Sequence, residues 1–282
     1  MNGAAAPLTA FIGTTPNIGT TAAAFATAYR IAEATGKSIG YLCLNLKSAK
    51  IHRYIGVDEP AVTLDKLRPE LRSYTLTPDK LRRAAYPVNR QPNLQVLFGN
   101  LLRDQAEFFT PEEAEHLLTV AEQAFSFVVL DLGAYWDNAA TICSIRRAST
   151  RVLVTTSALS HFGEDGRRWI GQVSPLFGVS REQYVSVLIK NPWRSGGFQM
   201  KHICKELGTE ALGQFQMSEP LFSHLDNGTY ADWLGTADEG KQAMRAPAKA
   251  IMQRHGIRSM ASTIAVQPWY RKLMTHRNGT SS

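Results

Sequence analysis

Short apolar runs alternate along the chain with longer segments whose apolar residues recur at helical spacing. Runs such as "FVVLDL" and "RVLVTT" are apolar throughout, as strands covered on both faces of a sheet are. The pattern predicts strands at residues 8–12, 38–46, 93–98, 126–132, 151–156, 184–189 and 212–217. Because helical segments separate them, we expect an α/β fold: a doubly wound, mostly parallel sheet of about seven or eight strands with helices on both faces. The unbroken apolarity of residues 126–131 predicts an interior strand.

Capping residues mark the ends of two of the expected helices. A helix over Thr20–Thr35 is expected to stop at Gly36. A second helix is expected over residues 110–123, because "TPEEAEH" offers Thr110 as the N-cap, proline at the first helical position and Glu113 for a capping box.

The last helical pattern covers residues 239–255, where Pro247 is expected to kink the helix or divide it in two. We expect residues 1–255 to form one domain and residues 256–282 to form a basic, aromatic tail outside it. In that tail, "PWYRKLMTHR" places aromatic side chains beside basic ones, which suits an anionic lipid surface. Packing of the tail on its own domain or on a partner subunit fits the same sequence equally well.

The composition is that of a globular protein without a membrane span. Hydrophobic residues make up 44% of the 282 residues and charged residues 20%. No apolar run approaches the roughly 18–20 residues of a transmembrane helix, and "MNGAAAPLTA" lacks the basic region of a secretory signal. We therefore expect a cytoplasmic protein with Cys43, Cys143 and Cys204 as free thiols.

The net charge of +7 is compatible with an acidic partner, either nucleic acid, anionic lipid or an acidic protein. An arginine-rich soluble surface explains the same charge. The histidines share no spacing typical of a metal site, so we interpret them as surface or packing residues.

The segment "FIGTTPNIGTTAAAFA", residues 11–26, has the layout of a phosphate-binding loop. An apolar strand leads into the turn-rich residues 13–19 and then into an alanine-rich helix, whose first backbone N–H groups would face a phosphate. The lysine of the pattern G-x-x-x-x-G-K-[ST] is missing, because Gly19 is followed by Thr20 and Thr21.

Ligands of open parallel sheets bind beyond the carboxyl ends of the strands. The segments expected there are residues 13–21, 45–50, 131–137 and 190–194.

Together these segments resemble the ParA/MinD class of deviant Walker ATPases, and most closely the CpaE/TadZ branch linked to Tad-type pilus machinery. "TPNIGTTA" falls on the family pattern K-G-G-x-G-[KT]-T-T, and "FVVLDLG" matches its Walker B strand. "YLCLNLKSAKIHRYIG" occupies the place of the aspartate-rich switch, and "VLIKNPW" that of the V-x-N-[KR] strand end. The resemblance covers about residues 8–255 and implies a P-loop NTPase fold.

The resemblance also implies roles for particular residues. ATP and Mg²⁺ are the implied cofactors, with the Thr21 hydroxyl and Asp131 on the metal side, Asn45 at the switch position and Asn191 reading adenine. The nucleotide phosphates would be bound by Thr15, Pro16, Asn17, Ile18, Gly19, Thr20 and Thr21.

The departures from the family pattern fall mainly on residues that relatives use for catalysis. Thr15 stands where relatives carry the lysine that reaches the partner's nucleotide across a dimer, and Thr20 where a lysine neutralises the β- and γ-phosphates. Asn45 replaces the switch carboxylate, while Pro16 and Asn17 replace two glycines. Phosphoryl transfer depends on positioning and on neutralising charge, so a loop without a cation predicts a pseudo-ATPase.

Each of these residues also has a purely structural interpretation. The loop threonines could be the first-turn residues of a buried helix, and Asn45 a turn residue at a strand end. Asp131 could cap the following loop, although we favour a retained metal-side carboxylate. Lys47 and Lys50 could replace the lost lysines, with Lys47 the first candidate, or be ordinary solvated side chains.

Two functions compete on this evidence. The first is a localisation or assembly factor for a pilus- or secretion-type machinery, with weak or no ATP binding, protein partners from that machinery, a homodimer formed without ATP, and the tail at the inner face of the membrane. The receiver-like N-terminal domain usual in the branch is not expected, because the first strand starts at residue 8.

The second function is an active ParA/MinD-type ATPase that partitions DNA or other cargo. The basic charge suits nonspecific DNA binding, but the neutral loop argues against turnover, and the arginine pairs are dispersed over different helices. A kinase or a nitrogenase-type reductase of the same fold would need lysine or cysteine ligands that are not in place.

Overall fold

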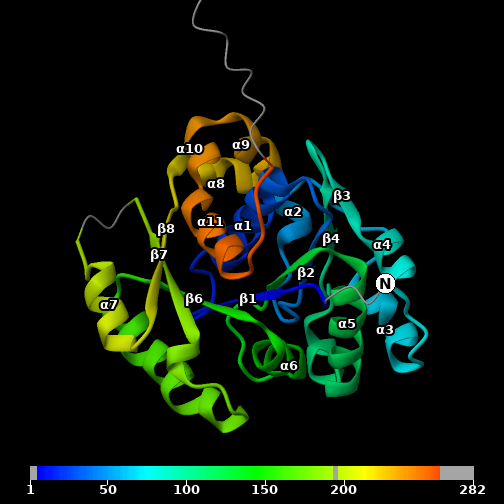
Figure 1. The fold of residues 1–282 in the computed structure, drawn as a ribbon, viewed down its shortest axis with the longest axis horizontal. Helices are drawn as coiled ribbons and strands as arrows, with labels where there is room; N and C mark the ends of the chain where they lie inside the picture. Colours follow the sequence, from blue (N-terminus) through cyan, green and yellow to red (C-terminus); the bar gives the residue numbers. More distant parts are fainter. Residues whose placement is uncertain (1–4, 193–195, 261–282) are drawn as a thin grey trace, which may run out of the picture.

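An eight-stranded sheet runs through the middle of the molecule in the order β3-β4-β2-β5-β1-β6-β7-β8 (Figure 1). The structure, a computed structural model, describes residues 5–192 and 196–260. All neighbouring strands in this sheet are parallel except β3 and β4, which are antiparallel. The strands are β1 (Leu8–Gly13), β2 (Ile39–Cys43), β3 (Tyr86–Val88), β4 (Gln91–Leu97), β5 (Phe127–Asp131), β6 (Thr150–Thr156), β7 (Tyr184–Lys190) and β8 (Glu210–Gln216). The predicted mostly parallel sheet is confirmed.

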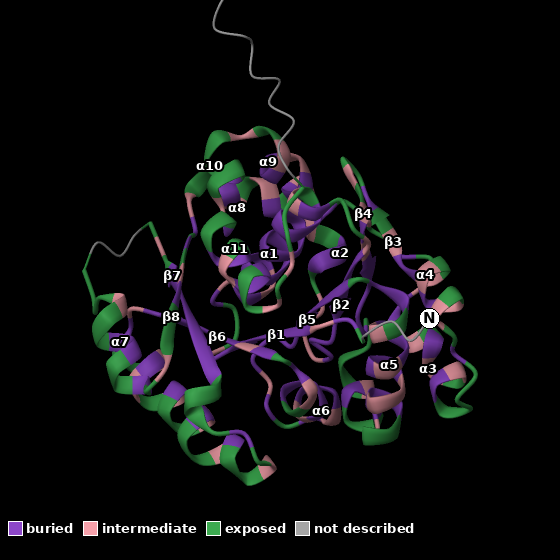
Figure 2. Cartoon of the chain, in the orientation of Figure 1, coloured by how far each residue is buried: buried purple, intermediate pink, exposed green. Residues whose placement is uncertain are grey.

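Helices cover both faces of this sheet (Figure 1). On one face lie α1 (Thr20–Thr35), α2 (Ile51–Tyr54), α8 (Glu219–Asp226), α9 (Tyr230–Thr236), α10 (Asp238–Gln242) and α11 (Arg245–Arg254). On the other lie α3 (Leu64–Arg72), α4 (Pro78–Ala84), α5 (Pro111–Ala124), α6 (Ala139–Arg147) and α7 (Met200–Leu207). Figure 2 shows the central strands buried between the two helical layers.

Strand β5 occupies the interior position that its apolar sequence predicts. It pairs with β2 on one side and β1 on the other, and all five of its residues are buried. Asp131, at its carboxyl end, lies in register with Phe11 of β1 and Cys43 of β2. The strand order therefore brings the loops that follow β1, β2 and β5 to one edge of the sheet.

The second strand is shorter than its apolar run predicts. It ends at Cys43, after which Leu44 N–H still bonds Asp131 O (2.8 Å) but Leu46 N–H turns back to Leu44 O (2.9 Å). Leu44 and Leu46 are nevertheless buried against the helices on the opposite face from α1. Their apolarity reflects packing of a turn, which a period-based prediction cannot distinguish from a strand.

The helix expected over residues 239–255 is divided, but not at Pro247. Helix α10 ends at Gln242 and α11 begins at Arg245, with Met244 between them in the left-handed region (φ 55°). Pro247 is the third residue of α11, where a backbone N–H has no intrahelical acceptor in any case. A proline there is tolerated without a kink, so the predicted break point is wrong.

Strand β3 was not expected from the sequence. It is three residues long, contains Pro87 and forms the edge of the sheet, where the missing proline N–H is tolerated. Its pairing with β4 is set by the hairpin turn at Arg90, which has φ 66°.

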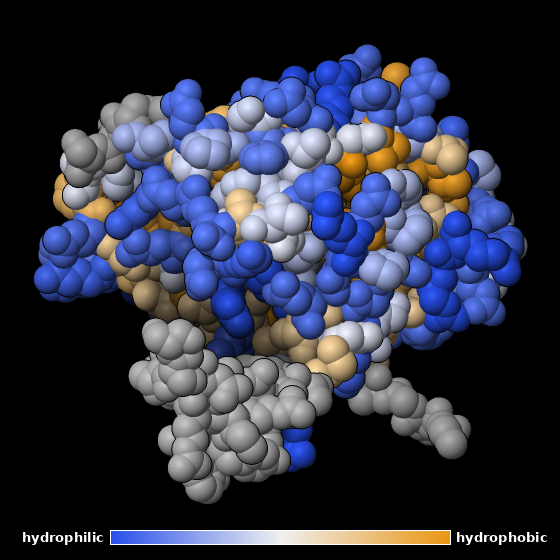
Figure 3. All heavy atoms as spheres, turned by 90° about the horizontal axis from the view of Figure 1, so that it is seen from above, coloured by the Kyte–Doolittle hydropathy of each residue, from blue (hydrophilic) through white to orange (hydrophobic). Residues whose placement is uncertain are grey.

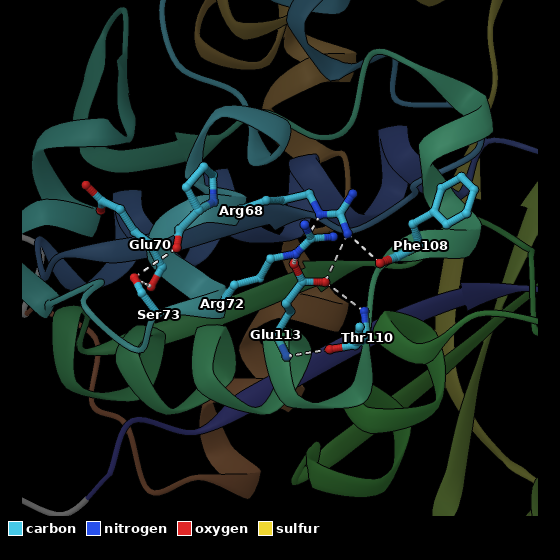
Figure 4. A network of polar contacts seen from close by, with 8 residues as sticks. Arg68, Glu70, Arg72, Ser73, Phe108, Thr110 and Glu113 are labelled. Carbon is cyan, nitrogen blue, oxygen red and sulfur yellow. Dashed lines mark hydrogen bonds and ion pairs between the residues drawn. The ribbon is translucent and has the colours of Figure 1, made fainter.

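The predicted start of α5 is confirmed (Figure 4). Thr110 Oγ1 accepts a hydrogen bond from Glu113 N–H (3.3 Å), and the Glu113 carboxylate accepts one from Thr110 N–H (2.8 Å). Pro111 occupies the first helical position. The capping box satisfies two of the N–H groups that a helix start leaves without partners.

Residues 256–260, the first of the predicted tail, lie against the end of α1. Ile257 packs on the core, and Met260 N–H donates to Ala34 O (2.8 Å). The aromatic and basic residues 268–277 lie outside the described residues.

No helix in the described ranges is long and apolar enough to cross a bilayer. Seen from above, the surface of the described residues is mainly hydrophilic, with small apolar areas (Figure 3).

Candidate functional site

The loop between β1 and α1 presents an uncapped helix start. Gly19 is the N-cap in the left-handed region (φ 101°), and Asn17 adopts a similar conformation (φ 61°). Asparagine is among the few non-glycine residues that tolerate this region, so Asn17 can stand where relatives carry glycine. The first turn of α1 has neither a side-chain cap nor an acidic residue. Its N–H groups and positive dipole end therefore remain available to an anion.

A cavity of about 290 Å³ opens at this helix start. It is lined by Thr15, Pro16, Asn17, Gly19, Thr20, Thr21, Ala22, Asn45, Ser48, Lys50, Tyr54, Gly133, Ala134, Tyr135, Met217, Phe222, Leu225 and Asp226. Ligand pockets usually measure roughly 300–1,000 Å³, so this one is at the small end. One wall is polar and comes from the loops after β1 and β2, and another is largely apolar and comes from Met217 and α8.

The two threonines that replace lysines in the family pattern are engaged within the chain. Thr15 Oγ1 donates to Asp165 Oδ2 (2.7 Å), in the segment after β6. Thr20 is buried, and its hydroxyl lies so close to Gly13 that a Cβ there would come within 2.5 Å of it. Both residues line the cavity, but neither brings a charge to it. Ile18, which was expected at the phosphates, is buried in the core and is not among the lining residues.

Two tryptophans hold the beginning of the loop. Trp136 donates its indole N–H to Gly13 O (3.3 Å), and Trp169 donates to Thr14 O (3.0 Å). The two rings are stacked, with centroids 5.4 Å apart and planes 2° from parallel. Trp136 lies in residues 131–137, which the sequence predicted to lie at the ligand-binding edge of the sheet. Nothing in the sequence indicated a role for Trp169. The pair connects the loop to the segments after β5 and β6.

Asp131 lies behind the cavity. Its carboxylate accepts hydrogen bonds from Thr21 Oγ1 (2.8 Å), the Tyr41 hydroxyl (2.9 Å) and Gly133 N–H (3.2 Å). Complete burial raises the pKa of Asp131, although these three hydrogen bonds lower it in part. Burial, and next the Asp131 carboxyl, raise the pKa of Tyr41 well above its usual value.

These residues fit Mg²⁺ only together with a phosphate. Thr21 gives its hydrogen to Asp131, which leaves its oxygen lone pairs free for a metal, whereas Asp131 does not line the cavity. No group of three or more His, Cys, Asp or Glu side chains within the described ranges could hold a metal ion. Because Mg²⁺ prefers several oxygen ligands, phosphate oxygens would have to complete its coordination.

Asn45, at the switch position, is one of the residues that line the cavity. Its amide lies over Gly133, where a Cβ would come within 2.4 Å of the amide carbon. Asn45 Nδ2 donates to Ser48 O (2.9 Å), while the buried Oδ1 has no partner. A buried acceptor without a donor costs free energy, and this oxygen is closed to solvent.

Lys50, and not Lys47, reaches the cavity. Lys50 Nζ donates to Asn17 Oδ1 (3.0 Å) at the tip of the loop. Lys47 Nζ forms an ion pair with Asp137 (2.6 Å) and is not among the lining residues. Lys50 is thus the one positively charged side chain among the described residues that line the cavity, and the substitution of a lost lysine by Lys47 stays a prediction.

The structure does not bring Asn191 to this cavity. Asn191 lines a separate hollow at the ends of β7 and β8, together with Lys190 and Gln216. Its expected role with adenine stays a prediction.

Comparison with known proteins identifies the fold. No protein-family model matches the chain, and no curated protein matches it. A ParA family ATPase from Chlorobium tepidum TLS has a similar structure (TM-score 0.72, 15% identity, 87% of this chain and 99% of that chain). The MinD cell division ATPase of Pyrococcus furiosus is similar at TM-score 0.71 and 16% identity over 88% of this chain and 98% of that chain. The septum site-determining protein MinD of Pyrococcus horikoshii OT3, solved in complex with Mg-ADP, also has a similar structure. Its TM-score is 0.70 at 16% identity, over 89% of this chain and 98% of that chain. The chain therefore has the fold of MinD/ParA ATPases.

Proposed function

We propose that the chain is a catalytically degenerate, CpaE/TadZ-like member of the MinD/ParA group. It acts as a localisation or assembly factor for a pilus- or secretion-type machinery and binds ATP weakly or not at all. The observation that carries this proposal is that the two loop threonines are engaged within their own chain. Thr15 is bonded to Asp165 of its own chain and Thr20 is buried against Gly13, so neither position supplies the charge of a lysine.

The charges around the cavity support a pseudo-ATPase. A helix start contributes roughly half a unit positive charge, far less than a nucleoside triphosphate brings in negative charge. Lys50 adds one exposed cation at the rim of the cavity. Asp131 does not line the cavity and is connected to it only by the hydrogen bond from Thr21. Loss of one preorganised group that stabilises developing charge typically costs about 100- to 1,000-fold in rate. Without both lysines and the switch carboxylate, turnover falls below detection.

We expect no Mg²⁺-dependent release of phosphate from ATP, and an ATP dissociation constant no tighter than about 1 mM, which corresponds to roughly 4 kcal/mol. Phosphate release and equilibrium titration measure the two quantities.

Thr20→Lys, alone or with Thr15→Lys, is expected to improve binding more than hydrolysis, because Asn45 and Pro16 remain. The oligomeric state should be the same with and without ATP, since Thr15 cannot pair with a partner's phosphates.

Robust hydrolysis by the unmodified protein, abolished by Asp131→Ala, would overturn this proposal. It would instead support the second candidate, an active ParA/MinD-type ATPase for DNA or cargo partitioning. The observation that favours this second candidate is Lys50, which brings a cation into the cavity. Salt-sensitive binding to nonspecific DNA would accompany that function.

We also propose that the protein is cytoplasmic and that its tail contacts an anionic membrane surface from that side. The support is the sequence of residues 268–277, in which aromatic and basic side chains are neighbours. The full chain is expected to co-sediment with anionic vesicles, and a chain lacking residues 267–282 to remain in the supernatant. Equal sedimentation of the two forms would rule out the membrane contact.

A further inference from the structure

Strand β8 forms one open edge of the sheet. No strand of the described residues lies beyond it, and the helices that contact it, α7 and α11, lie on opposite faces of the sheet. The other edge strand, β3, is poorly suited to pairing, because it has only three residues and includes Pro87, which cannot donate a hydrogen bond. Strand β8 has seven residues and no proline. It is therefore the edge on which a further strand can pair.

The outward backbone groups of β8 belong to Gln214 and Gln216. Met217 N–H donates to Lys190 O (2.7 Å), so Met217 faces β7. Successive residues of a strand direct their N–H and C=O groups to opposite sides, so Phe215 also faces β7, while Gln214 and Gln216 face away from it. Both glutamines are exposed. Their backbone donors and acceptors are thus free to pair with another strand.

This edge is complementary to itself in an antiparallel pair centred on Phe215. A two-fold axis at Phe215 places Gln214 of each chain opposite Gln216 of the other, and each of these pairs exchanges two backbone hydrogen bonds. No charged residue lies within residues 213–217, so no like charges meet across the axis. The register of β8 with β7 skips Leu212, which limits regular pairing to the residues after it.

We propose that two copies of this chain dimerise through β8, antiparallel and centred on Phe215, so that their two eight-stranded sheets become continuous. The inference rests on the proposed function in that this dimer forms without ATP, and Gln214 and Gln216 do not line the cavity. Phe198 is 46% exposed and lines the hollow beside both glutamines, so it supplies apolar area to the interface. Because the strand pair is short, the interface is small and the dimer depends on protein concentration.

Sedimentation equilibrium of the full chain in EDTA, without nucleotide, tests the proposal by exchanging charges across the axis. Gln214→Lys combined with Gln216→Lys brings like charges together in both pairs and is expected to weaken the dimer about tenfold. Gln214→Lys combined with Gln216→Glu brings opposite charges together and should keep the dissociation constant within about threefold of the unmodified chain. Gln172→Lys combined with Gln242→Lys is the control for added charge, because both glutamines are exposed and lie outside β8.

Hydrogen exchange measures the same contact without a substitution. The amides of Gln214 and Gln216 are expected to become protected as the protein concentration rises. The amide of Met217, which is bonded to Lys190 O, should be protected at every concentration. Protection of both glutamine amides at all concentrations that is lost on removal of residues 261–282 would show that the tail covers this edge, and would overturn the proposal.

The proposal is also overturned if the unmodified chain is still monomeric at about 1 mM, or if the two β8 double variants dimerise equally well. Thermal unfolding verifies that each variant is folded. Hydrolysis of ATP by the unmodified protein would instead overturn the proposed function and leave the comparison of the β8 variants without nucleotide valid.

Discussion

Replacing Trp136 with alanine is expected to lower the free energy of unfolding by about 3–5 kcal/mol, as measured by urea denaturation. Trp136 is only 3% exposed, stacks on Trp169 and donates its indole N–H to Gly13 O. Alanine would remove a large buried side chain, leave a cavity beneath the loop and leave a loop carbonyl without its donor. A loss below about 1 kcal/mol would mean that the packing around Trp136 contributes little.

Trp136→Phe separates the ring from its hydrogen bond. Phenylalanine keeps an aromatic ring but cannot donate to Gly13 O, which is expected to cost about 1–3 kcal/mol. Trp233→Phe is the matched control, because Trp233 is equally buried but lies on the opposite face of the sheet. If the hydrogen bond to Gly13 O stabilises the loop, Trp136→Phe should lower the free energy of unfolding more than Trp233→Phe does. Equal losses of unfolding free energy would show that the indole hydrogen bond adds nothing to the packing of the ring.

Glu113→Ala is expected to destabilise the fold by about 3–5 kcal/mol, because it leaves the largely buried guanidinium group of Arg68 without its counter-charge and removes the partner of the exposed Arg72. The Glu113 side chain is 1% exposed and accepts hydrogen bonds from Arg72 Nε (2.8 Å) and from two atoms of Arg68 (3.2 Å each). Arg68 also donates to Phe108 O, so the network joins α3 to the start of α5 (Figure 4). The same carboxylate closes the capping box, which alanine would also remove.

Glu115→Ala on the same helix is the matched control. Its carboxylate pairs with Arg147 at 3.0 Å, but it is half exposed and Arg147 retains Glu122 as a second partner. Exposed pairs contribute about 0–1 kcal/mol, so urea denaturation should show a much smaller loss than for Glu113→Ala. Equal losses would contradict the assignment of Glu113 as the centre of the network.

The Glu113 network should also make the free energy of unfolding depend on pH in the acidic range. Burial alone would raise the pKa of Glu113, but hydrogen bonds from Arg68, Thr110 N–H and Arg72 together lower it. A carboxylate whose pKa is lower in the folded than in the unfolded chain stabilises the fold above its ordinary pKa, about 4.3, and this contribution is lost as the pH falls through the folded value. Glu113→Gln should therefore flatten the acid side of the curve of unfolding free energy against pH.

Local chemistry along the chain was sufficient for most of the architecture. Uninterrupted apolarity predicted that β5 is interior, and the Thr110–Glu113 capping box predicted the start of α5. Both depend on contacts between sequence neighbours or on burial of both faces of a strand, and the residue pattern encodes these directly. The strand–loop–helix layout of residues 8–35 was readable for the same reason.

The cavity itself depends on contacts that no local pattern encodes. Lys47 and Lys50 are three residues apart in a polar segment, and only the turn after β2 decides which one faces Asn17 and which one pairs with Asp137. Thr15 meets Asp165 150 positions along the chain, because the strand order places β6 beside β1. The stacking of Trp136 on Trp169 likewise requires the segments after β5 and β6 to converge on the loop. The side-chain period and the caps are properties of neighbours in sequence, whereas these contacts arise only when the sheet order sets distant loops side by side.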